Sequence, residues 1–195
     1  MSDHNHTDTH NHGRNHSHYV SEVKGINLLI TMILNLVITA VEMIGGLYSG
    51  SLSLISDAVH NLSDALSIVV SYFAIKMSQK SNDENKTFGY KRSTILAAVI
   101  NSTALIAISI FLFKEAYFKF LTPQKINGAI VIWVALIGLL ANALGAYLLH
   151  KGSKGDINMK SAYLHLLSDA MSSIGVVVGG IVIYYFNIFW VDPLL

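Results

Sequence analysis

Long apolar runs separated by short polar segments dominate the pattern of this chain. Five such runs cover residues 25–48, 52–77, 94–113, 126–150 and 157–186. Each run reaches the ~20 residues that a helix needs to cross the hydrocarbon core of a bilayer. The pattern therefore predicts an all-α, polytopic transmembrane helix bundle. Residues 78–92 form the one sizeable polar loop, and the link at residues 49–51 is short enough to make the first two spans an antiparallel hairpin.

The two ends of the chain depart from this pattern. Residues 1–24 are rich in histidine and lack the apolar residues needed to fold, which predicts a disordered tail. His-rich tracts of this kind are typical of metal-gathering arms, and a passive solvated tail is the alternative. At the other end, residues 187–195 (NIFWVDPLL) resemble the start of a sixth span that is cut short. The alternative there is an interfacial Trp190 anchor close to a true carboxyl terminus.

Composition supports the membrane assignment and narrows the chemistry. Of the residues, 52% are hydrophobic and only 13% are charged, and the mean hydropathy is +0.50. This balance is typical of an integral membrane protein. The chain contains no cysteine, which excludes disulfides, thiolate metal sites and cysteine nucleophiles within it. Any metal ligands must therefore be nitrogen or oxygen atoms, and the net charge of +1 points to no nucleic-acid partner.

The distribution of lysine and arginine predicts the orientation. With a cytoplasmic amino terminus, the cytoplasmic side would hold ten of these residues and the opposite side three. The ten are Arg14, Lys24, Lys76, Lys80, Lys86, Lys91, Arg92, Lys151, Lys154 and Lys160, and the three are Lys114, Lys119 and Lys125. Cytoplasmic segments of membrane proteins carry the excess of positive charge, so the amino terminus is predicted to be cytoplasmic.

Two pairs of ionisable residues with the same spacing lie inside separate apolar runs. His60 and Asp64 are in the second run, on one helical face with Asp57, and His165 and Asp169 are in the fifth. A carboxylate at the centre of a bilayer costs at least ~2.5 kcal/mol, so such pairs need a reason. If the two spans are neighbours, their opposite directions place His60 level with Asp169 and Asp64 level with His165. The four side chains would then form a closed set of two nitrogen and two oxygen donors.

This donor set suits a divalent cation, and Zn²⁺ in particular, because zinc accepts both imidazole and carboxylate in four-coordinate sites. Cobalt, iron, manganese and cadmium are chemically possible as well. An empty site would take up protons instead, which suggests exchange of metal against protons. The alternative for each pair is a hydrogen-bonding role within the bundle.

Polar residues on other spans indicate a polar interior. Five residues in the first span share one helical face: Asn27, Thr31, Asn35, Thr39 and Glu42. This face is expected to look into a cavity. Glu42 is either a proton carrier or the partner of a polar neighbour, and Asn101 and Asn142 are expected to make hydrogen bonds between helices.

Four segments resemble the cation diffusion facilitator family, especially its bacterial zinc exporters. They are SLSLISDAVHNLSDALS in the second run, TFGYKRSTILAAVIN entering the third, GLLANALGAYLLH in the fourth and SAYLHLLSDAMSSIG in the fifth. The similarity covers residues 25–195. It implies a six-helix transmembrane domain, a homodimer in the bacterial inner membrane, and export of Zn²⁺ as a transported substrate in exchange for protons. The transport site that it implies is His60, Asp64, His165 and Asp169.

The same resemblance implies parts that the chain lacks and leaves rival functions to weigh. Family members usually continue into a sixth span and a cytoplasmic domain, so the chain is expected to be truncated after Leu195.

A metal facilitator without proton coupling is one alternative to a proton-coupled exporter. A membrane cytochrome with His60 and His165 as haem ligands is another, although it gives the aspartates no role. An enzyme is not expected, because no His-Glu-x-x-His motif is present and four protein ligands leave no position for an activated water.

Overall fold

The computed structural model of the chain describes residues 14–78 and 93–195, which form five long helices and two short 3₁₀ helices. In chain order they are α1 (Arg14–Ser49), α2 (Leu52–Ser78), α3 (Ser93–Leu121), α4 (Gly128–His150), η2 (Gly152–Lys154), α5 (Ile157–Phe186) and η3 (Phe189–Leu194). These described ranges contain no strand. The prediction of an all-α helix bundle is confirmed.

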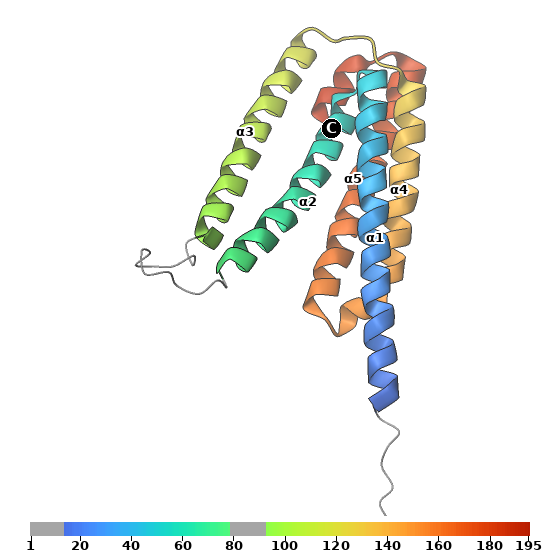
Figure 1. Cartoon of the computed structure of the whole chain (residues 1–195). Helices are drawn as coiled ribbons and strands as arrows, with labels where there is room; N and C mark the ends of the chain where they lie inside the picture. The colour runs from blue at the N-terminus through green and yellow to red at the C-terminus, as the bar shows by residue number, and fades with distance from the viewer. Residues whose placement is uncertain (1–13, 79–92) are drawn as a thin grey trace, which may run out of the picture.

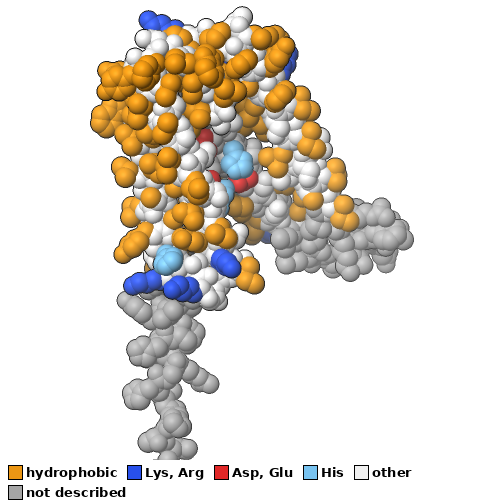
Figure 2. Space-filling view, turned by 180° about the vertical axis from the view of Figure 1, so that it is seen from behind, with side chains coloured by type: hydrophobic (Ala, Val, Ile, Leu, Met, Phe, Trp, Pro, Cys, Tyr) orange, Lys and Arg blue, Asp and Glu red, His pale blue; other side chains and the backbone are white. Residues whose placement is uncertain are grey.

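The helices have the length and surface of membrane spans. Within the described residues, four segments are long and apolar enough to cross a bilayer: Leu29–Ser49, Ile95–Leu121, Gly128–His150 and Ile157–Phe186. Hydrophobic side chains cover much of the face seen in Figure 2, as expected for a surface in contact with lipid. α2 is also of membrane length at 27 residues, but the polar side chains along one of its faces make it less apolar than the others.

Helices α1, α4 and α5 form the compact part of the bundle, whereas α2 packs on α1 and α3. In Figure 1, α2 and α3 lean away from the other three helices toward the Ser78 end of α2. The α4–α5 pair is the tightest, because glycine allows the two backbones to approach closely. A Cβ atom added at Gly128 would lie 2.8 Å from the backbone nitrogen of Tyr184, so only glycine fits there.

The amino-terminal end of α2 is held by a buried carboxylate from the far end of the chain. Asp192 in η3 is 1% exposed and accepts hydrogen bonds from the Leu52 amide (2.6 Å), the Ser51 hydroxyl (2.5 Å) and the Ser53 hydroxyl (2.8 Å). Ser51 itself accepts from the Leu54 amide and acts as the N-cap. A carboxylate at a helix amino terminus also interacts favourably with the helix dipole. The position of α2 is therefore coupled to η3.

Several predicted boundaries were wrong. α1 begins at Arg14, so residues 14–24, which were predicted to be disordered, continue the first helix. Once the apolar part of a helix is fixed by packing, adding further turns costs little. α3 extends to Leu121 rather than ending at Phe113, and the charged end of Lys119 in its last turn donates to the Gly50 carbonyl (2.9 Å). Residues 1–13 and most of the predicted loop, 79–92, lie outside the described residues.

The segment that was predicted to begin a sixth span folds as η3 in the structure. Asn187 ends α5 with a left-handed backbone (φ 53°), and its amide donates to the Ile183 carbonyl. This turn directs the chain back across the end of the bundle toward α2. A further span after η3 stays a prediction.

Candidate metal centre

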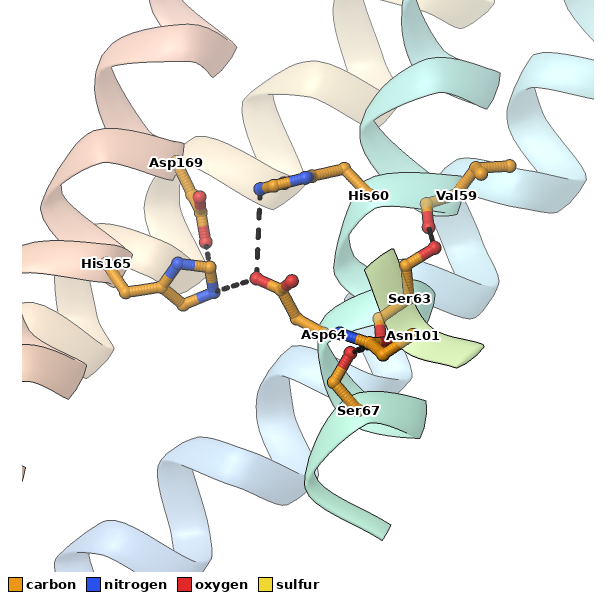
Figure 3. A network of polar contacts seen from close by, with 8 residues as sticks. All are labelled: Val59, His60, Ser63, Asp64, Ser67, Asn101, His165 and Asp169. Carbon is orange, nitrogen blue, oxygen red and sulfur yellow. Dashed lines mark hydrogen bonds and ion pairs between the residues drawn. The ribbon is translucent and has the colours of Figure 1, made fainter. Parts of the chain in front are cut away.

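All four predicted donors lie at one place between α2 and α5. Figure 3 shows His60 and Asp64 from α2 facing His165 and Asp169 from α5. His60 Nε2 is 3.8 Å from Asp64 Oδ2, which is also 3.8 Å from His165 Nε2. His165 Nε2 is 3.5 Å from Asp169 Oδ2. The structure thus brings together side chains that are about a hundred residues apart in the sequence, and Asp64 is level with His165 as predicted.

The spacing is slightly wider than that of a closed metal site. Ligand bonds of ~2.0–2.2 Å in a tetrahedron place neighbouring donor atoms ~3.3–3.6 Å apart. The measured separations of 3.5 and 3.8 Å lie at and just above this range. Among the described residues, no group of three or more His, Asp or Glu side chains is arranged so that it could hold a metal ion in this conformation. Closing the set would require the α2 side chains to move toward α5, because the His60 and His165 ring centroids are 6.2 Å apart.

Exposure differs sharply between the two helices. The side chains of His60 and Asp64 are 58% and 41% exposed, whereas those of His165 and Asp169 are 35% and 6% exposed. Figure 2 shows histidine and acidic side chains together in a hollow of the otherwise apolar face. An ion could therefore reach the donors from the α2 side, while Asp169 forms the floor of the site.

Helix α3 supports the α2 half of the site. The Ser67 hydroxyl, one turn after Asp64, bonds to Asn101 Oδ1 on α3, and the Ser63 hydroxyl donates to the Val59 carbonyl (Figure 3). The prediction that Asn101 makes an interhelical hydrogen bond is confirmed. For Asn142 the same prediction was wrong, because neither side-chain atom has a hydrogen-bond partner although the residue is fully buried.

Part of the polar face of α1 is buried inside the bundle. Thr31, Thr39 and Glu42 are 3%, 5% and 1% exposed. Glu42 packs against Gly138 of α4, whose missing side chain leaves room for the carboxylate: a Cβ atom there would lie 2.7 Å from Glu42 Oε1. Glu42 therefore lies in the packed interior, next to α4, rather than facing an open cavity.

Sequence reasoning missed two residues. Asn61 is 1% exposed and lies beside Glu42. Its position next to His60 in a polar stretch was the available signal. Asp192, which holds the amino terminus of α2, gave no local signal because its partners lie 139 to 141 residues away. Asp57 is half-buried near the site, and it makes no hydrogen bond that the described residues show. The predicted metal-gathering segment lies largely outside the described residues.

The comparisons with known proteins agree on one family. The model of the cation efflux transmembrane domain matches residues 28–195. The chain is 40% identical over 187 residues to the "Cadmium, cobalt and zinc/H(+)-K(+) antiporter" of Bacillus subtilis, covering 93% of the chain and 58% of that protein. It is 42% identical over 182 residues to "Zinc transporter ZitB" of Pectobacterium atrosepticum, covering 93% of the chain and 57% of that protein.

A third relative is "Zinc transporter ZitB" of Escherichia coli, which is 35% identical over 187 residues, or 95% of the chain and 60% of that protein. The chain therefore spans somewhat more than half the length of these relatives. The matches confirm the resemblance that the motifs indicated.

Proposed function

The chain belongs to the cation efflux, or cation diffusion facilitator, family, and we propose that it is the transmembrane part of an exporter of Zn²⁺ that holds the ion at His60, Asp64, His165 and Asp169. The observation that carries this proposal is the convergence of these donors from α2 and α5, with separations of 3.5 and 3.8 Å. Zinc is the transported substrate and not a resident cofactor. The protein is a multi-pass membrane protein and acts as a transporter, not as an enzyme.

The chemistry of the donors supports a divalent transition-metal ion. Two carboxylates neutralise the charge of a dication, and two imidazoles favour zinc over calcium or magnesium. Cadmium and cobalt are secondary candidates, because both accept nitrogen and oxygen ligands and both occur in the name of the Bacillus subtilis relative.

Exchange against protons follows from the same donors. Zinc requires neutral imidazoles and ionised carboxylates, so an ion that leaves is replaced by protons and an ion that arrives displaces them. The amino terminus lies on the cytoplasmic side of the bacterial inner membrane, according to the excess of lysine and arginine there. Zinc then binds from the cytoplasm and leaves on the opposite side. From the family resemblance, the protein works as a homodimer.

A haem protein is a weaker candidate. Haem ligation by His60 and His165 would require the iron and its macrocycle to lie between the two imidazoles. Asp64 Oδ2 occupies that space, 3.8 Å from Nε2 of each histidine. The absence of a Soret band in the purified protein would settle the matter.

Transport by the purified protein in liposomes tests the proposal. With a zinc-sensitive dye inside the vesicles and a pH-sensitive dye in parallel samples, an imposed proton gradient should drive zinc movement, and added zinc should move protons in the opposite direction. His150→Ala is the matched control for an alanine variant of a site histidine, and it should keep its zinc flux. His150 lies on α4 beside Tyr163 and outside the site. Zinc flux without any proton movement would leave uncoupled facilitation as the function, and a lack of flux would overturn the proposal.

A further inference from the structure

Seven buried polar atoms on four helices have no hydrogen-bond partner within the described part of the protein. They are Asn35 Oδ1, Glu42 Oε2, Asn61 Oδ1 and Nδ2, Asn142 Oδ1 and Nδ2, and Asp169 Oδ2. Glu42, Asn61 and Asn142 are 1%, 1% and 0% exposed, so bulk water does not reach them in this conformation. Buried polar groups are nearly always paired, and so many exceptions in one small bundle require an explanation.

The packing register places three of these residues at one level. α4 and α5 run antiparallel with Gly145 against Leu166. Asn142 is three residues before Gly145 and Asp169 is three residues after Leu166, so Asn142 and Asp169 lie at the same height.

The register between α4 and α1 gives the same result. Gly145 packs against Thr31, and Gly138 packs against Ile38. Asn142 lies about midway between these two glycines, and Asn35 lies about midway between Thr31 and Ile38. The unpaired atoms of Asn35, Asn142 and Asp169 are therefore gathered at one height in the compact part of the bundle.

The remaining two residues continue this group by about two turns along α1. Glu42 packs against Gly138, one turn of α4 from Asn142. Asn61 lies beside the Glu42 carboxylate, and Asp57 and Asp169 are within electrostatic range of it. Yet neither side-chain atom of Asn61 makes a hydrogen bond of normal length.

The chemical types of the atoms identify what would pair them. Five of the seven are oxygens, which accept hydrogen bonds, and two are amide nitrogens, which donate them. A bare cation could pair only with the oxygens and would repel the amide hydrogens. Water both donates and accepts, and buried water typically makes about three hydrogen bonds to such groups.

We propose that Asn35, Glu42, Asn61 and Asn142 line an internal water-binding site between α1, α2 and α4 that reaches Asp169 from its buried side. The bound molecules are ordered waters that bridge the amides and carboxylates. The site meets the metal centre at Asp169 Oδ2, the atom that also lies 3.5 Å from His165 Nε2. It does not depend on the identity of the transported ion.

Thiol accessibility tests the proposal directly, because the chain contains no cysteine. Asn142→Cys and Ala135→Cys place thiols on the same helix at positions that are 0% and 2% exposed. Ala135 lies in the apolar cluster with Leu54 and Val131 and serves as the dry control. With a small water-soluble methanethiosulfonate and mass spectrometry of the full protein in detergent, we expect position 142 to react at least tenfold faster than position 135. Equal rates in two variants that are both monodisperse would overturn the proposal.

The sign of a stability change provides the second test. Asn142→Leu keeps the shape of the side chain but removes both of its polar atoms. If the site were dry, this change would remove two unpaired groups and raise the melting temperature. If water bridges the Asn142 amide to its neighbours, the leucine displaces that water and leaves Asn35 and Asp169 unpaired. We then expect the melting temperature to fall by several degrees. A rise in the melting temperature of Asn142→Leu would overturn the proposal. A bound cation instead of water would make the unchanged protein melt at a higher temperature in K⁺ or Na⁺ than in N-methylglucamine at equal ionic strength, and this result would also overturn the proposal.

Discussion

The same His-x-x-x-Asp pair occurs on α2 and on α5, but the two helices give it different surroundings. On α5, the Asp169 side chain is 6% exposed, and the helix packs closely against α4 through glycine contacts. On α2, His60 and Asp64 are 58% and 41% exposed, and the helix packs on α1 and α3. Asp169 is embedded in the compact part of the bundle, whereas His165 is 35% exposed, close to the 41% of Asp64. The α2 pair faces them from a helix that leans away (Figure 1).

This difference indicates a division of labour in the metal centre. The α5 pair is held in place by its neighbours and provides a preformed half. The α2 pair can adjust relative to α5, because the polar contact described between these two helices is the one from Asp64 to His165. The other polar contacts of α2 go elsewhere, to Asp192 in η3 and to Asn101 in α3. Closing the 3.8 Å separations around an ion would therefore move α2 toward α5 more than the reverse.

The strongest test of this division compares Asp169→Ala with His60→Ala. Loss of an outer-shell partner typically costs ~10–100-fold in metal affinity, and loss of a direct ligand should exceed this. Removing buried Asp169 leaves a gap in the fixed half, whereas water can take the place of exposed His60. We expect both variants to lose zinc flux, with zinc affinity reduced at least about tenfold more by Asp169→Ala. Calorimetry on the purified variants measures this order, and the reverse order would contradict the division.

The second test loosens α2 alone. Asp192→Ala removes the acceptor of four hydrogen bonds at the buried start of α2. We expect it to lower the free energy of unfolding by about 3 kcal/mol, because a buried acceptor and a helix cap are lost together. Thermal unfolding in detergent measures the change.

Asp156→Ala is the matched control for that experiment. Asp156 caps α5 by accepting from the Asn158 and Met159 amides, but these bonds are exposed or only partly buried. Its loss should cost about 1 kcal/mol. Equal destabilisation by the two changes would mean that η3 does not hold α2.

The third test uses pH. A protonated imidazole cannot bind zinc, so protons compete with the metal and zinc affinity should fall as the pH is lowered from ~7 to ~5.5. Two histidine ligands must both be neutral for zinc to bind, so the fall should be steeper in the unchanged protein than in His60→Ala, where His165 alone remains. Titrations in buffers of different ionisation enthalpy count the released protons, and an affinity that is flat over this range would contradict ligation by either histidine.

The local part of this architecture was predictable from sequence. Apolar run length located the helices, and the repeated spacing in residues 60–64 and 165–169 pointed to four side chains that the structure places near one another. Both signals arise within single helices. The different burial of His60 and Asp169 was not predictable, because it depends on how closely α4 packs on α5. The Asp192 cap was missed for a similar reason, since no local pattern links Asp192 to Ser51 across 141 residues.

The smallest effect expected concerns the metal preference of the adjustable half. His60→Asp replaces a nitrogen donor with a harder oxygen donor and adds a negative charge at the most exposed of the four positions. Because α2 can adjust, the site should still close, and its affinity for manganese or cadmium relative to zinc should rise about tenfold. His150→Asp is the control, because it makes the same chemical change on α4 beside Tyr163, outside the site. Competition calorimetry measures the ratio in both variants. An equal ratio in the two would mean that His60 is not a ligand and that the α5 pair, with Asp64, holds the ion alone.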